Sequence, residues 1–296
     1  FSSKIQINEN GTPEQFYDQI ISFVKERNNS NKKLVEDLNN EDRDFLNQYL
    51  FSIIAETEED NGVNSDIFKF NKARDSSIAV SKRTMEILSR IKLKDELNYG
   101  IHDAEFCWLV YNMLKGSKID FSETEYESNK FINGNYYFYY DRDGFRIAIG
   151  GKGKNIYTGH FDFIIDTGGD DVYNIDRETN DRFKNNFSCI IDLSGNDYYT
   201  SGSNYSLAGS VFSSGFIFDK EGDDTYKGKN VSLGSAVCGL GVLYDENGND
   251  TYQANQFSIG ASSFGVGLLL DRNGNDVYLA NSYSQGFGMT EGLSLI

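Results

Sequence analysis

The strongest constraint on this chain is an eight-residue pattern that occurs five times in its second half. The pattern reads Asp, two residues, Gly, Asn or Asp, Asp, any residue, Tyr. Its copies occupy residues 166–173, 192–199, 219–226, 245–252 and 271–278. The leading aspartates are 26, 27, 26 and 26 residues apart. A fixed period of this length predicts a repeat architecture, in which each unit buries its apolar face only by stacking on its neighbours.

The residues before each leading aspartate alternate between bulky and small side chains. Before Asp271, Leu268 and Leu270 lie on one face, and Gly265 and Gly267 lie on the other. A period of two predicts a strand, and the glycines predict that another backbone packs closely against the bare face. We therefore expect a parallel β-solenoid (β-helix) with one turn per ~26-residue repeat. A ribbon of stacked β-hairpins is the alternative.

The first part of the chain has a different pattern, so the whole is predicted to be an α+β multidomain protein. Apolar residues recur at helical spacing over 12–117, and Thr12, Pro13 and Gln15 form a typical helix start. The spacing predicts a short helix over 32–38, a long helix over 65–91 and a last helix from Asp103 to Gly116. The predicted domains are 1–120 (helical), 121–165 (β-hairpin and capping repeat) and 166–296 (solenoid).

The predicted cap contains a degenerate copy of the repeat. Residues 150–157 keep the glycine and the tyrosine in register, but Gly150 and Asn155 replace the two aspartates. Lys152 and Lys154 would partly neutralise the end of an acidic stack. Terminal repeats are atypical because they close the stack. At the other end, the next leading aspartate would fall at position 297, so we expect the natural protein to continue beyond Ile296.

The charge balance limits the classes of partner. The formal net charge is −17, from 28 basic and 45 acidic side chains. Such a chain repels phosphate groups, so we expect no nucleic-acid partner, and no apolar run is long enough for direct membrane insertion. Cys107, Cys189 and Cys238 lie in apolar runs, which predicts buried free thiols.

Stacked turns would place the aspartates in two columns of like charge. Equivalent residues of neighbouring turns lie about 4.8 Å apart in a solenoid, where two carboxylates repel by roughly 3–4 kcal/mol at an effective dielectric of 20. Calcium between the turns would offset this repulsion, and so would backbone N–H groups of the turn itself. The candidate metal ligands are Asp166, Asp171, Asp192, Asp197, Asp219, Asp224, Asp245, Asp250, Asp271 and Asp276. The acidic stretch 56–66 lacks the EF-hand glycine and is predicted to be a solvated loop.

The turn resembles the calcium-binding repeats of the repeats-in-toxin family, which implies calcium shared between aspartates of successive turns. That family has a period of nine residues, and only the turn matches. Gly265-Val-Gly267 with Gly274 and Tyr278 is similar to MORN repeats, which implies the hairpin ribbon. The layout as a whole resembles uncharacterised bacterial proteins with Gly-Asn-Asp-x-Tyr repeats, which implies no activity.

The repeated tyrosines predict either a packed aromatic column or, if exposed, a platform for sugar rings. They are Tyr173, Tyr199, Tyr226, Tyr252 and Tyr278. His102 and His160 each lie near an aspartate, but neither belongs to a recognisable catalytic motif, and we expect no catalytic residue. We expect a non-enzymatic scaffold or assembly component of a bacterial surface, extracellular or periplasmic structure, with protein partners or self-assembly. A carbohydrate-binding or polysaccharide-processing β-helix is the alternative.

Overall fold

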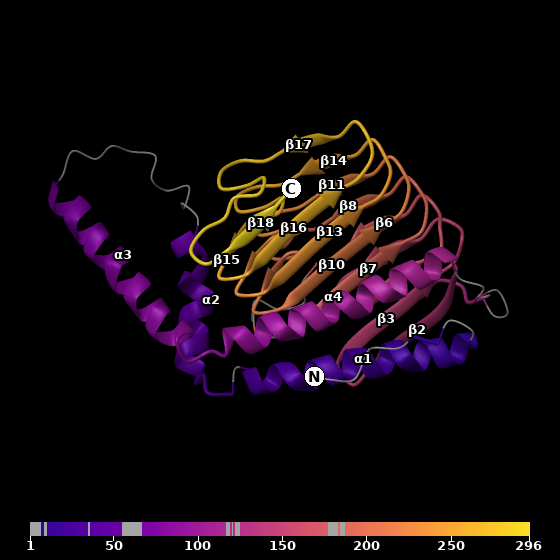
Figure 1. Cartoon of the computed structure of the whole chain (residues 1–296), viewed down its shortest axis with the longest axis horizontal. Coiled ribbons are helices and arrows are strands. Elements are labelled where there is room, and N and C mark those ends of the chain that lie inside the picture. The colour runs from indigo at the N-terminus through magenta and orange to yellow at the C-terminus, as the bar shows by residue number, and fades with distance from the viewer. Residues whose placement is uncertain are drawn as a thin grey trace.

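In the part of the chain that the structure describes, four helices precede a parallel β-solenoid of about five turns, which spans residues 163–295 (Figure 1). The structure is a computed structural model that describes residues 7–8, 11–34, 36–54, 67–116, 119, 121, 125–176, 183 and 187–296. The predicted acidic loop 56–66 lies outside these residues. Within them, no helix has the length and apolar character needed to cross a lipid bilayer.

Each turn of the solenoid contains a long strand, a sharp corner and a short strand. The long strands end at or near the leading aspartate and form one sheet: β2 (Tyr136–Arg142), β3 (Phe145–Gly150), β5 (Phe163–Asp166), β7 (Phe187–Asp192), β10 (Ser214–Asp219), β13 (Leu240–Asp245), β16 (Val266–Asp271) and β18 (Leu293–Leu295). The short strands form the second sheet: β1 (Ile132–Asn133), β4 (Ile156–Thr158), β6 (Val172–Asn174), β8 (Tyr198–Thr200), β11 (Thr225–Lys227), β14 (Thr251–Gln253) and β17 (Val277–Leu279). The last three complete turns add a third sheet: β9 (Ser210–Val211), β12 (Ala236–Val237) and β15 (Ser262–Ser263).

The register of the strands places equivalent repeat positions side by side. Asp219 pairs with Asp245 between β10 and β13, and Tyr226 pairs with Tyr252 between β11 and β14, all in parallel orientation. This arrangement confirms the predicted parallel solenoid. The hairpin-ribbon alternative is wrong, because consecutive repeats pair in parallel. Among the described strands, antiparallel pairing joins β2 to β3 and β1 to β4, at the cap.

The turn glycine is required by the close approach of the neighbouring turn. A Cβ atom built on Gly248 would lie 1.9 Å from the carbonyl oxygen of Gly222. On Gly241, in the bare face of β13, it would lie 2.5 Å from the carbonyl oxygen of Ser235. The expected close packing against the bare face is therefore confirmed, and the neighbour is the backbone that leads into the third sheet.

The bulky face of the long strands points out of the solenoid and is covered by helices α1 (Pro13–Leu34) and α4 (Leu93–Gly116) (Figure 1). Phe23 of α1 stacks on Phe106 of α4 with 3.8 Å between ring centroids, and its ring meets Phe187 of β7 edge-on at 5.4 Å. One hydrophobic core therefore includes residues of both helices and of the long strands.

Buried ion pairs hold the two helices together over the sheet. Arg27 of α1 donates to Asp103 at 2.5 Å and to Glu96 at 2.9 Å, both on α4, and its guanidinium also reaches Ser214 of β10. All three charged side chains are buried. Removing one partner of such a cluster leaves an uncompensated buried charge, which is strongly destabilising.

The helix start at Thr12 was predicted correctly. The backbone N–H of Gln15 donates to Thr12 Oγ1, and the N–H of Thr12 donates to Gln15 Oε1. Two helix boundaries were wrong: α1 is continuous to Leu34, so no separate helix begins at residue 32, and α4 begins at Leu93, ten residues before Asp103. The remaining helices are α2 (Asn40–Ile54) and α3 (Ile67–Leu88).

One pair of leading aspartates is 27 rather than 26 residues apart, and the additional residue lies in a single corner. Tyr199 pairs with Tyr226, but the left-handed residues that follow them in the next corner are Tyr205 and Val231, so the earlier turn has one more residue in between. Asp176 of the preceding turn accepts the N–H of Gly202 in that longer corner at 2.6 Å. The extra residue leaves the strands on both sides in register.

Candidate metal centres

The fold brings the predicted aspartates together in four groups of three. Each group contains both aspartates of one turn and the leading aspartate of the next, with one oxygen of each residue within 4.8 Å of the others. The groups are Asp166–Asp171–Asp192, Asp192–Asp197–Asp219, Asp219–Asp224–Asp245 and Asp245–Asp250–Asp271. Asp276 of the last described turn lies outside the four groups.

The tyrosines link each turn to the next through the leading aspartates. The Tyr226 hydroxyl donates to Asp245 Oδ2 at 2.7 Å, and Tyr173 and Tyr199 make the same bond to Asp192 and Asp219. Each of these bonds uses one oxygen of a leading carboxylate. The other oxygen, Oδ1, has no hydrogen-bond donor among the described residues in Asp219 and Asp245.

The second aspartate of each copy is the one at the sixth position of the pattern, and it accepts a hydrogen bond from the backbone of the preceding turn. Asp224 Oδ1 accepts the N–H of Asp197 at 2.6 Å, and Asp250 Oδ1 accepts the N–H of Asp224 at 2.7 Å. The hydrogen bonds to the turn's own backbone that the sequence predicts are made by the first two leading residues: Asp166 and Asp192 each accept the N–H two residues later in their own turn, at 2.9 Å. In each copy of the pattern, a backbone N–H therefore donates a hydrogen bond to one oxygen of the second aspartate.

Several buried carboxylate oxygens of the four groups have no hydrogen-bond donor among the described residues. They are Asp171 Oδ2, Asp197 Oδ2, Asp219 Oδ1, Asp224 Oδ2, Asp245 Oδ1 and Asp250 Oδ2. The group Asp219–Asp224–Asp245 contains three of them. A buried carboxylate oxygen without a partner carries a large desolvation cost, so these groups need a bound proton or a cation.

Burial raises the pKa of the second aspartate in each of the four groups, and the effect grows from Asp171 to Asp224. The pKa of Asp171 is raised to about 6, that of Asp197 to about 7, and those of Asp224 and Asp250 to about 8. Loss of hydration is the largest cause in every case. Lys154 acts in the opposite direction on Asp171, at the cap end. Burial also raises the pKa of the leading aspartates Asp166, Asp192 and Asp219 well above the usual value. Without a cation, protons are therefore held along the stack at neutral pH.

In the cap turn, amide groups rather than a further carboxylate lie beside the first group, Asp166–Asp171–Asp192. Asn155 occupies the position of the second aspartate; its Nδ2 donates to Asp166 Oδ2 at 3.1 Å and its N–H to Asp171 Oδ1 at 2.5 Å. A Cβ on Gly150 would lie 2.0 Å from the Tyr157 hydroxyl, so no side chain fits where the leading aspartate would be.

The tyrosine column is packed inside the solenoid. Tyr173, Tyr199, Tyr226 and Tyr252 are buried, and successive rings stack at 4.5–4.8 Å with interplanar angles of 2–10°. Their faces contact one another and are closed to solvent. The carbohydrate platform considered from the sequence would therefore have no exposed ring face along these four residues; Tyr278 is partly exposed in the last turn.

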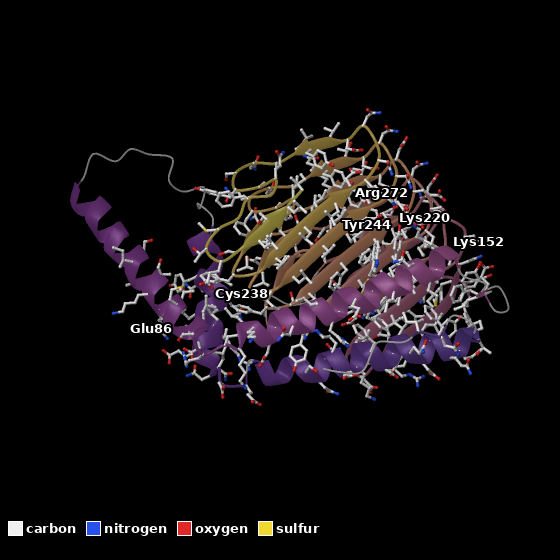
Figure 2. All side chains as sticks on the ribbon, viewed as in Figure 1. Glu86, Lys152, Lys220, Cys238, Tyr244 and Arg272 are labelled. Carbon is white, nitrogen blue, oxygen red and sulfur yellow. The ribbon has the colours of Figure 1, made fainter. Side chains whose placement is uncertain are left out.

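Basic residues lie on the outer rim of the aspartate corner. Figure 2 shows Lys152, Lys220 and Arg272 along the edge of the stack, and Arg272 pairs with Glu246 of the preceding turn at 3.4 Å. Lys220 and Arg272 directly follow leading aspartates, with side chains that reach solvent. Their positive charges screen the acidic rim, but their side chains do not reach the buried aspartates.

The histidines and cysteines have structural surroundings. His160 is buried with its Nε2 3.6 Å from Asp162 Oδ1, and Asp162 already accepts the N–H of Arg146. His102 stacks on Phe23 with 6.1 Å between centroids. The prediction of buried free thiols is confirmed for all three cysteines.

No protein-family model, curated protein or solved structure matches this chain.

Proposed function

We propose that this protein is a non-enzymatic scaffold whose solenoid is stabilised by calcium bound between successive turns. The observation that carries the proposal is the repeated group of three buried carboxylates with oxygens that have no donor. Four such groups in a row form a line of equivalent sites along one corner. Binding at each site would join two turns, so the cation would stiffen the stack as a whole.

The donor set suits calcium better than other cations. All candidate ligands are carboxylate oxygens, which hard cations prefer, and histidine and cysteine are absent from the four groups. Calcium accepts irregular geometry and completes its shell with backbone carbonyls and water, whereas magnesium loses its water reluctantly. Asp219 Oδ1, Asp224 Oδ2 and Asp245 Oδ1 would supply the side-chain oxygens of the most complete site.

A stiff, acidic rod of this kind fits a structural part of a bacterial surface, secreted or periplasmic assembly. Calcium is abundant outside cells, where a site that depends on it would stay occupied. The outer face of the solenoid also offers the repeated strand and corner surfaces on which protein partners or further copies would assemble.

The test is thermal unfolding followed by circular dichroism, in EDTA and then with calcium or magnesium restored. We expect EDTA to lower the midpoint and calcium, but not magnesium, to restore it, because a ligand that binds only the folded chain stabilises it by about 2.7 kcal/mol per site at 100 times its Kd. No change in the midpoint would show that the groups hold protons instead.

Matched substitutions locate the effect. Asp224→Asn gives one internal turn the amide that Asn155 provides in the cap, and it should remove one bound calcium per chain in equilibrium dialysis. Asp223→Asn changes the neighbouring residue of the same corner, which bonds Asn249 at the surface, and should leave the calcium count unchanged. Equal calcium counts in both variants would contradict the assignment.

A further inference from the structure

A cleft of about 410 Å³ lies at the cap end of the molecule, away from the repeated corner. Three segments that are distant in sequence form it: the start of α1, the chain after α4 and strand β2, and Figure 1 shows α1 running beside β2 and β3. Its lining is Pro13, Glu14, Tyr17, Phe121, Tyr126, Tyr136, Tyr137, Phe138 and Tyr139. The volume is within the range of small-molecule sites, about 300–1,000 Å³.

Aromatic rings in nearly parallel pairs line this cleft. Tyr17 stacks on Phe138 with 4.3 Å between centroids and an interplanar angle of 18°, and Tyr126 stacks on Tyr136 at 5.7 Å and 24°. Tyr126 is 51% exposed, and Tyr17 and Tyr136 are partly exposed. In contrast to the buried column of the solenoid, these three tyrosines keep part of their surface exposed to solvent beside the stacked faces.

The polar groups of the cleft are hydroxyls and one carboxylate. Five of the lining residues are tyrosines, and each phenol both donates and accepts hydrogen bonds. Burial and the nearby Glu14 raise the pKa of Tyr17 to about 12, so its hydroxyl stays protonated. No lysine or arginine belongs to the described lining, and Glu14 adds negative charge. An anionic ligand would therefore find no counter-charge here.

We propose that this aromatic cleft binds a neutral saccharide. Flat aromatic faces match the C–H faces of a sugar ring, and the tyrosine hydroxyls and Glu14 match the hydroxyl groups at its edge. The overall charge of −17 disfavours acidic polysaccharides. The site goes beyond the scaffold role: it would let the rod attach to, or carry, a glycan at its capped end.

The experiment is saturation-transfer NMR followed by calorimetric titration with cellohexaose, chitohexaose and maltohexaose as probes. We expect at least one of them to bind, and Tyr126→Ala to weaken that binding about tenfold or more. The variant should fold, because Tyr126 pairs with Tyr136 through backbone atoms, at 2.8 and 3.0 Å, and its side chain is half exposed. Tyr198→Ala, at an exposed tyrosine of β8 outside the cleft, is the control and should bind as the unchanged protein does.

Three outcomes would overturn the proposal. They are no binding of any of the three saccharides up to about 10 mM, equal affinity of the Tyr126→Ala variant, and an equal loss in the Tyr198→Ala control. Choline and a proline-rich decapeptide are titrated in parallel, since aromatic clefts also bind these. If either binds in the cleft while the saccharides do not, the site is assigned to that ligand instead. Glu14→Gln separates the cases further: it should abolish choline binding and change saccharide binding by less than about threefold.

Discussion

The cap turn and the turns around Asp219 and Asp245 follow the same backbone path, but their buried carboxylates have different hydrogen-bond partners. In the cap, the leading position is Gly150, and Asp166 Oδ2 accepts hydrogen bonds from the Asn155 amide and the Tyr157 hydroxyl. Farther along, Asp219 Oδ1 and Asp245 Oδ1 have no donor among the described residues. The geometry of the corner therefore does not require two aspartates per turn. Their retention in every internal copy points to a role beyond turn formation.

The largest effect should be the pH dependence of stability in EDTA. Burial raises the pKa of Asp224 and Asp250 to about 8, so between about pH 4 and pH 8 the folded chain holds more protons than the unfolded chain. Stability must then fall as pH rises through this window, by about 3 kcal/mol or more between pH 5 and pH 8. Urea unfolding at each pH measures this, and calcium should remove most of the fall. A flat profile in EDTA would contradict uncompensated carboxyl groups.

The next largest effect on stability should come from the turn glycine, which has a preceding turn beside it in the solenoid but not in the cap. Gly248→Ala should destabilise the protein by about 1–3 kcal/mol, because its Cβ would lie 1.9 Å from the Gly222 carbonyl oxygen. Gly153→Ala occupies the same pattern position in the cap, where nothing lies within 4 Å, and should change stability by less than about 0.5 kcal/mol. Denaturant midpoints measure both. Equal losses would mean that backbone flexibility, rather than contact between turns, explains the glycine.

The smallest effect concerns the tyrosine hydroxyls. Tyr226→Phe removes the hydroxyl that donates to Asp245 Oδ2 and should cost about 1–2 kcal/mol. Tyr157→Phe should cost less, about 0.5–1 kcal/mol, because Asn155 Nδ2 still donates to Asp166 Oδ2. The ring stack is unchanged in both variants, so the difference isolates the hydrogen bond. Thermal unfolding in calcium measures both losses, and equal losses would show that the second donor is unimportant.

The repeat half could be predicted closely from the sequence, because residues one repeat apart lie side by side when the turns stack. Once the corner recurs every 26 residues, Asp219 must lie beside Asp245, and Tyr226 beside Tyr252. The same logic predicted the closeness of the carboxylates. It did not predict that Asp224 would bond the N–H of Asp197 in the preceding turn, since this depends on the rise and tilt of each turn.

The helical half was less predictable because its periodic pattern does not identify its packing partner. The bulky face of the long strands was visible, but not that α1 and α4 cover it, as Phe23 does for Phe187. The cleft at the cap was missed for a similar reason. Tyr17, Tyr126 and Tyr136 come from three segments with no common motif. A dense run of tyrosines in β2 was the available signal, but the sequence predicted only a β-hairpin in this region.

The longer corner between Tyr199 and Tyr205 suggests a use for the molecule as a display frame. A loop that accepts one more residue while both adjoining strands keep their register is a natural place to graft a foreign peptide. Equivalent corners recur in each turn, about 4.8 Å apart along the stack. Peptides inserted at every second or third turn would be presented in a straight row with fixed spacing, which flexible linkers cannot provide.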